Sequence, residues 1–261
     1  MKALGIAATG MNAQQTNVDV IANNIANAQT TGYKAGRAVF QDLIYQSMRR
    51  EGAATSADGT STPVGIDIGL GARAAGIVRN NEQGGLVETG NDLDMAIDGR
   101  GFFVINRPDG TVAYSRDGNF GLSPEGEIIS MDGYPLDPGI VVPENTTEIE
   151  ISQTGLVTAY VSGEAEPQEI GQLTLATFVN EAGLKAVGQN LFLESGASGE
   201  PILAEPGTDG SGLIRQKYVE GSNVDSIKQI TDLIKAQRSY EMNSKVMTTA
   251  DQMLQTANQV R

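Results

Sequence analysis

The C-terminal stretch from residue 221 to residue 261 constrains the fold most strongly. Ser222 followed by Asp225 predicts a helix start, and neither Pro nor Gly occurs from Ile227 to Arg261. From residue 233 onward, small and apolar side chains recur on alternating steps of three and four, interrupted only at Asn243: Leu233, Ala236, Tyr240, Met247, Ala250, Leu254 and Ala257. This 3.5-residue repeat is typical of a helix that packs lengthwise against a partner.

A similar pattern occupies the other end of the chain. The same spacing is followed by Leu4, Ala7, Met11, Gln14, Val18, Ile21, Ile25 and Ala28. Residues 1–28 carry only two charged side chains, Lys2 and Asp19, whereas a helix with one solvated face usually carries several there. We therefore predict that residues 1–32 and 220–261 form one discontinuous, coiled-coil-like helical domain. An ordinary helix within a monomeric domain is the alternative.

The two patterns also predict a self-assembly interface, in which the terminal helices pack on copies of themselves. We assign to it Leu4, Ala7, Met11, Val18, Ile21, Ile25, Leu233, Ala236, Tyr240, Met247, Ala250, Leu254 and Ala257.

The middle of the chain has a different character. Asp-Gly pairs, which favour tight hairpin turns, recur at 98–99, 109–110, 117–118 and 132–133 between short apolar runs. Residues 80–212 carry a charge balance of −18, and the flanking blocks carry +2 each, which gives the chain its −14. We predict an acidic, antiparallel all-β domain over 80–210 and an α+β fold overall. This charge argues against nucleic acids and anionic membranes as partners.

Residues 33–79 together with 211–219 are expected to connect the two domains. Residues 64–71 alternate in polarity as an extended strand does. The Gly69-Leu70-Gly71 sequence does not indicate a nucleotide loop, because no helical pattern follows it. Residues 51–63 have the Gly, Ala, Ser and Thr content of a flexible linker.

The composition excludes several kinds of chemistry. The chain contains no Cys, His or Trp, so it has neither disulfides nor a Ser-His-Asp triad. Asp92, Asp94 and Asp98 resemble part of a calcium loop, but Ala96 and Phe103 occupy two of the ligand positions. We assign no catalytic, cofactor-binding or metal-binding residues. A secreted carbohydrate-active enzyme that uses carboxylates is the alternative from another class, and no residue pair can be nominated for it.

Nothing in the sequence indicates insertion into a membrane. No apolar run approaches the ~20 residues that a spanning helix needs. The first residues lack the apolar segment and cleavage pattern of a signal peptide, so export would use another route.

The end of the first helix carries a specific resemblance. A run rich in Asn and Ala leads into a Thr-Gly-Tyr-Lys turn, as in the bacterial flagellar rod and hook proteins, the axial family. The matching residues are Asn23, Asn24, Ile25, Ala26, Asn27, Thr31, Gly32, Tyr33 and Lys34. Segments 93–103, 114–120, 220–224 and 237–243 also resemble this family, so the likeness runs nearly from end to end.

The resemblance implies a structural role rather than catalysis. Axial proteins polymerise into a helical shaft that transmits torque from the motor to the hook, and type III export delivers them without a cleaved signal peptide. The implied partners are copies of the chain, proximal rod and hook proteins, the surrounding periplasmic and outer-membrane ring proteins, and the export apparatus. The implied location is the basal body, across the periplasm.

Chain length and an added segment near 46–63 favour a distal rod member over the longer hook protein. A hook subunit and a proximal rod subunit remain the alternatives. In the family this segment is thought to stiffen the polymer; whether it does so here or forms a plain loop is left open.

Overall fold

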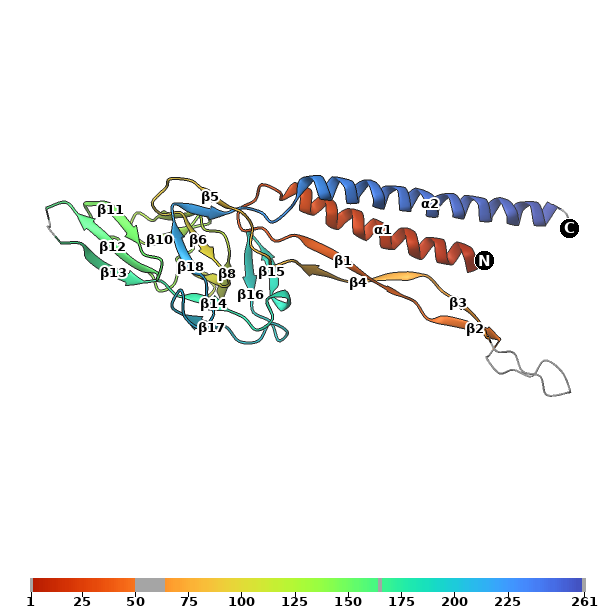
Figure 1. The fold of residues 1–261 in the computed structure, drawn as a ribbon, viewed down its shortest axis with the longest axis horizontal. Coiled ribbons are helices and arrows are strands. Elements are labelled where there is room, and N and C mark those ends of the chain that lie inside the picture. The colour runs from red at the N-terminus through yellow and green to blue at the C-terminus, as the bar shows by residue number, and fades with distance from the viewer. Residues whose placement is uncertain (1, 50–63, 164–165, 260–261) are drawn as a thin grey trace. The chain divides into compact units, whose positions relative to one another are not determined.

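The computed structural model describes residues 2–49, 64–163 and 166–259, and the chain divides into two compact units (Figure 1). The first, here called the helical unit, comprises Met1–Ala26, Gly36–Val78 and Asp225–Arg261. The second, the β unit, comprises Asn27–Ala35 and Arg79–Val224. The turn that follows the first helix is therefore grouped with the β unit.

Two long antiparallel helices dominate the helical unit. Helix α1 spans Lys2–Ala26 and helix α2 spans Ser226–Gln259. They lie side by side along most of α1 (Figure 1), as the matching patterns at the two ends of the sequence predicted. The start of α2 differs from the prediction. The Asp225 carboxylate accepts hydrogen bonds from the backbone N–H groups of Ile227 and Lys228, so Asp225 and not Ser222 caps the helix.

A two-stranded ribbon completes the helical unit. Strand β1 (Gly36–Asp42) pairs with β4 (Ala72–Arg79), and β2 (Tyr45–Arg49) pairs with β3 (Ile66–Gly69). The ribbon packs on α1 near Gly71, whose φ of +115° and close approach to Thr9 exclude a side chain. Residues 36–49 of the connecting segment are therefore mainly strand. Residues 50–63 of the proposed insertion lie outside the described residues.

The β unit consists of small antiparallel sheets around a shared core. The largest sheet has the order β15-β16-β8-β7-β14-β17, with the bounds Lys185–Gly188, Leu191–Leu193, Val112–Ser115, Phe102–Asn106, Leu175–Thr177 and Ile202–Ala204. A second sheet contains β11 (Thr146–Ile151), β12 (Leu156–Val161) and β13 (Gln168–Gln172). The short helix η1 spans Glu181–Gly183.

Three two-stranded pairs surround these sheets. Strand β5 (Leu86–Glu88) pairs with β19 (Tyr218–Glu220), β6 (Met95–Asp98) with β18 (Leu213–Gln216), and β9 (Phe120–Leu122) with β10 (Ile128–Ser130). The pairs formed by β18 and β19 connect the C-terminal part of the chain to strands that precede it by more than a hundred residues.

The largest sheet is covered on both faces. Successive side chains of a strand point to opposite faces, and Phe103 of β7 enters the main core beside Phe120 while Phe102 packs with Phe178 and Phe192 on the other face. This explains why the run from 102 to 105 is apolar throughout rather than alternating.

The predicted α+β class is confirmed, with a helix at each end and an antiparallel β region between them. Two of the four Asp-Gly pairs lie in turns, Asp109-Gly110 and Asp132-Gly133, whereas Asp98 is the last residue of β6 and residues 117–118 lie in an irregular segment between β8 and β9. Asp109-Gly110 joins β7 to β8, and Gly110 has a φ of +80°, which its lack of a Cβ permits.

Candidate assembly surface

Helix α1 buries only part of its predicted interface within one chain. Ala7 and Ile21 are buried, whereas the longer side chains at the other assigned positions stay partly accessible: Leu4, Met11, Val18 and Ile25. Ala13 and Val20, which the spacing did not select, are buried as well. One chain therefore leaves part of the apolar surface of α1 available.

Helix α2 leaves more of its surface exposed. Ala236 and Ala250 are buried, Leu233 and Met247 are partly buried, and two assigned positions are exposed, Tyr240 and Leu254. The side chain of Ala257 lies outside the described part of the structure.

A second set of exposed apolar side chains lies on α2 and was not predicted from the sequence. Its members lie outside the predicted self-assembly interface: Ile227, Ile230, Ile234, Met242, Val246 and Met253. Ile227 is 79% exposed. The three isoleucines recur at steps of three and four, so the signal was present in the sequence but fell outside the single stripe that was followed.

The ribbon of the helical unit also presents apolar side chains to solvent. They include Phe40, Ile44, Tyr45, Met48, Ile66, Leu70 and Ile77, and Ile44 is 80% exposed. Contiguous exposed apolar surface on a soluble chain commonly marks a site of protein association. The helical unit exposes several large apolar side chains on α2 and on the ribbon.

Three hydrogen bonds of Asn24 align the helices and the ribbon. Asn24, which is 1% exposed, donates from Nδ2 to the Gly36 carbonyl at 2.8 Å and to Gln229 Oε1 at 3.2 Å. Its Oδ1 accepts from the Gly36 N–H at 2.9 Å. Farther along the pair, a Cβ on Gly10 would lie 2.9 Å from Asn243 Nδ2. Asn243, the residue that interrupts the three-four spacing on α2, therefore packs against Gly10 of α1, which has no side chain.

The family-motif residues are divided between two places. Asn23, Asn24, Ile25 and Ala26 belong to α1, whereas Asn27, Thr31, Gly32, Tyr33 and Lys34 belong to the turn in the β unit. Thr31 Oγ1 donates to Asp117 Oδ1 at 2.9 Å. Gly32 has a φ of +66°, and a Cβ there would meet the backbone of Arg116 at 2.7 Å. Its N–H donates to the Glu220 carbonyl at 2.8 Å.

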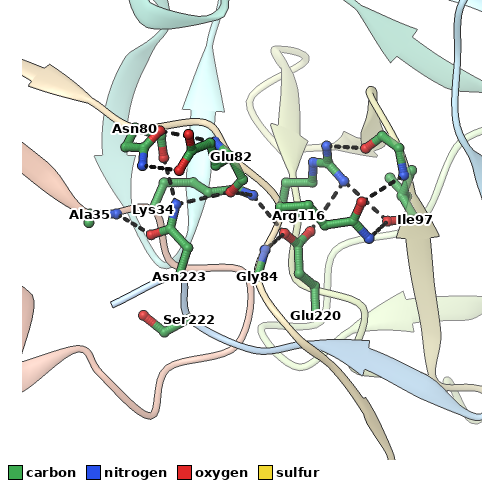
Figure 2. Close-up of polar contacts among 12 residues, drawn as sticks. Lys34, Ala35, Asn80, Glu82, Gly84, Ile97, Arg116, Glu220, Ser222 and Asn223 are labelled. Atoms are coloured by element: carbon green, nitrogen blue, oxygen red, sulfur yellow. Dashed lines mark hydrogen bonds and ion pairs between the residues drawn. The ribbon is translucent and has the colours of Figure 1, made fainter. Parts of the chain in front are cut away.

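A buried charge cluster holds this turn (Figure 2). Lys34 Nζ lies 2.6 Å from Glu220 Oε1, and Arg116 Nη1 lies 3.2 Å from Glu220 Oε2. The three side chains are each no more than 3% exposed. The Gly84 N–H also donates to Glu220 Oε1, at 2.8 Å. One carboxylate thus serves two cations and one amide from three separate segments.

The cluster has an electrostatic imbalance of one positive charge. Burial lowers the pKa of Lys34 from its ordinary value of 10.5, and the Glu220 carboxylate opposes that shift. Burial likewise lowers the pKa of Arg116, again opposed by Glu220. Arg116 has further support, since its Nη2 donates to the Gly99 carbonyl at 2.6 Å and its guanidinium lies 5.5 Å from the centre of the Phe102 ring.

Asn223 fastens the segment next to this cluster. Its Oδ1 accepts from the Ala35 N–H at 2.7 Å, and its Nδ2 donates to the carbonyls of Asn80 and Glu82 at 2.8 and 2.9 Å (Figure 2). Segments 31–35, 79–84 and 220–223 therefore meet at one point of the β unit. Several of these residues belong to segments that resemble the family, but the contacts between them were not predicted from the sequence.

The aspartates once compared with a calcium loop have protein partners. Asp92 pairs with Lys217 at 2.9 Å and Asp98 with Arg215 at 2.7 Å, and Asp94 accepts from Thr89 and Asn91. In the described ranges 2–49, 64–163 and 166–259, acidic side chains do not gather into a group that could hold a metal ion. Among the same residues, neither helix is long and apolar enough to cross a bilayer.

Comparison with known protein families gives matches along most of the chain. A model described as "Flagella basal body rod protein" matches residues 4–34. One described as "Flagellar hook protein FlgE/F/G D1 domain" matches residues 96–159, and "Flagellar basal body rod FlgEFG protein C-terminal" matches residues 215–260. The first match ends at Lys34, and the third contains its ion-pair partner, Glu220.

Individual relatives extend over the full length. The chain is 52% identical to flagellar basal-body rod protein FlgG of Caulobacter vibrioides, with 100% of each chain covered. It is 52% identical to the same protein of Agrobacterium fabrum, with 97% of each covered. It is 38% identical to that of Bacillus subtilis, with 98% of this chain and 97% of the relative covered. This chain belongs to the flagellar basal-body rod protein family and is a structural rod subunit of the flagellar basal body.

Proposed function

We propose that this chain forms the distal rod by polymerising into a rigid helical shaft that transmits torque from the motor to the hook. The supporting observation is the exposed apolar surface of the helical unit on α2 and on the ribbon. One heterologous contact, repeated without closing into a ring, generates a helical polymer. Fully burying a single Ile or Met side chain contributes about 1.5–3 kcal/mol before ordering costs are subtracted.

In this proposal the helical domain, residues 1–32 with 220–261, makes a coiled-coil-like inner layer. Side chains of the predicted self-assembly interface that stay accessible in one chain, such as Met11, Val18 and Tyr240, would contact neighbouring copies. Residues 33–79 with 211–219 connect this layer to an outer layer formed by the acidic residues 80–210. The role is structural and involves no catalysis.

The proposed partners follow from the position of a distal rod in the basal body. Proximal rod and hook proteins join the two ends of the polymer, and the periplasmic and outer-membrane ring proteins surround it. The flagellar export apparatus delivers the chain across the inner membrane. Relatives that carry the basal-body rod name along their full length support this placement.

Sedimentation and electron microscopy of the purified full chain over a range of concentrations test the proposal. We expect straight polymers above a critical concentration. Changing Ile230 and Ile234 together to Ser should raise that concentration at least tenfold, because two exposed apolar contacts of roughly 1 kcal/mol or more each are lost. The melting temperature of the monomer should change little, because both side chains are exposed.

Val179→Ser is the matched control, since Val179 is an exposed apolar residue of the β unit. It should leave the critical concentration nearly unchanged. A wild-type chain that stays monomeric at every concentration, or a chain without both helices that still forms shafts, contradicts the proposal.

A further inference from the structure

A cavity of about 230 Å³ opens in the β unit beside the family-motif turn. Its lining includes Tyr33, Lys34, Arg79, Asn190 and Phe192. Two of these side chains are cations, in a unit whose charge is otherwise strongly negative. The cavity therefore differs in charge from the rest of the β unit.

The two cations are not equivalent. Lys34 Nζ is ion-paired with Glu220 at 2.6 Å. Arg79 has no carboxylate within ion-pair distance among the residues that the structure describes. Its guanidinium stacks 4.9 Å from the centre of the Phe192 ring, and Nη1 donates to the Leu184 carbonyl at 3.1 Å.

The remaining donors of Arg79 give the cavity a specific chemistry. A guanidinium carries five N–H donors in a planar fork, and the described residues accept from only one nitrogen of it. Burial lowers the pKa of Arg79, and the nearby Tyr33 hydroxyl partly offsets this shift. Because Phe192 and the Leu184 carbonyl hold the group in place, little side-chain entropy is left to lose when an anion binds.

We propose that this cavity binds the carboxylate of an Asp or Glu side chain from a neighbouring copy of the chain. A planar guanidinium fork matches a carboxylate through two parallel hydrogen bonds. The chain supplies such a ligand abundantly, with 32 Asp and Glu against 18 Lys and Arg. The inference rests on the proposed self-assembly and identifies one polar contact within it.

Arg79→Gln in the full chain tests this role. Loss of a charge-assisted contact should raise the critical concentration for polymerisation about tenfold. Arg215→Gln is the control, because Arg215 is an exposed arginine of the β unit, outside the ribbon and the helices, and its loss changes the net charge equally. It should shift the critical concentration less than twofold. Thermal unfolding of each monomer separates loss of assembly from loss of folding.

A cross-linking measurement identifies the ligand directly. The chain has no cysteine, so Ala186→Cys at the cavity wall can carry a single maleimide-benzophenone probe. Polymers mixed from ¹⁴N and ¹⁵N chains should yield intermolecular cross-links to a peptide that contains Asp or Glu. Exclusively intramolecular cross-links, or intermolecular links only to peptides without acidic residues, overturn the assignment.

The two proposals fail in different ways. A wild-type chain that never polymerises refutes the self-assembly on which both depend. A wild-type chain that polymerises, together with an Arg79→Gln variant that folds and polymerises at the same concentration, refutes only the carboxylate site.

Discussion

Lys34 Nζ lies 2.6 Å from Glu220 Oε1 although the two residues are 186 positions apart. The same carboxylate also pairs with Arg116. The N-terminal motif of the family and the start of its C-terminal match are therefore joined by one buried ion pair. Sequence comparison shows only that Lys34 and Glu220 lie in segments similar to the family. The ion pair indicates that the two residues also contribute to the stability of the fold.

Removing the carboxylate should cost more than removing one cation. Glu220→Gln leaves two buried cations without a counter-charge, and we expect it to lower the free energy of unfolding by about 3–5 kcal/mol. Lys34→Met leaves one carboxylate with one guanidinium and should cost about 1–2 kcal/mol. Urea denaturation at neutral pH measures both. The exposed Lys185, changed to Met, controls for loss of a surface charge, and equal costs for the two cluster variants contradict this account.

The cluster also predicts a pH dependence. Burial lowers the pKa of Lys34 below 10.5, so the folded state binds fewer protons at this site than the unfolded state in the window between the two values. The contribution of Lys34 to stability therefore rises with pH through that window and is constant above 10.5. Burial raises the pKa values of Tyr33 and Tyr114 above 10.0, so their contribution falls as the pH passes 10.

Urea denaturation of the wild type and of Lys34→Met at several pH values up to 10.5 separates these effects. The tyrosine contribution is common to both proteins, so it cancels in their difference. The wild type should gain stability relative to the variant as the pH rises. A constant difference over this range would show that Lys34 keeps an ordinary pKa, and a shrinking one that its pKa is raised; either result contradicts the prediction.

Contact between Gly10 and Asn243 predicts a marked difference between two helical glycines. Gly10→Leu should destabilise the helical unit by about 1–3 kcal/mol, because the new side chain overlaps the Asn243 amide. Gly5→Leu should instead stabilise it by about 0.5–1 kcal/mol, since a Cβ at Gly5 meets nothing within 4 Å and helix propensity improves. Urea denaturation measures both changes. Adding Asn243→Ala to Gly10→Leu should recover part of the lost stability. Strictly additive effects of the two substitutions on the free energy of unfolding would contradict a contact between these residues.

Asn24 is predicted to fix the position of β1 on the helix pair. Asn24→Leu keeps a similar volume but leaves the N–H and carbonyl of Gly36 without their side-chain partner, which should cost about 2–3 kcal/mol. Asn12→Leu, at an exposed position of the same helix, should cost less than about 0.5 kcal/mol. Hydrogen exchange of the Gly36 amide should accelerate in the first variant only. Unchanged exchange there would show that Asn24 does not hold the strand.

Local patterns allowed much of the fold to be predicted. The three-four spacing that includes Ala7, Ile21, Ala236 and Ala250 placed a long helix at each end, and these four side chains are buried. Asp109-Gly110 marked a hairpin because its backbone requirement is local. In both cases the residues that determine the type of element lie within a short stretch of the sequence.

The remaining features depend on contacts that no local pattern encodes. In the sequence, Glu220 is a single acidic residue without a distinctive pattern around it. Its role becomes evident only in the structure, where β19 places it beside Lys34 and Arg116. Ser222 and Asp225 are equally good helix caps by residue type. Asp225 serves because Asn223 is held outside the helix by Ala35, Asn80 and Glu82. Arg79 has no carboxylate partner in the part of the chain that the structure describes, and this likewise depends on three-dimensional neighbours that the sequence does not specify.

The Lys34–Glu220 pair imposes an order of events on a chain that is synthesised from its N-terminal end. The motif turn arrives early, but its counter-charge and the Asn223 side chain arrive only after more than four-fifths of the residues. Until then the turn lacks the contacts that fix it. The β unit therefore completes its fold late, when little besides helix α2 remains to be synthesised.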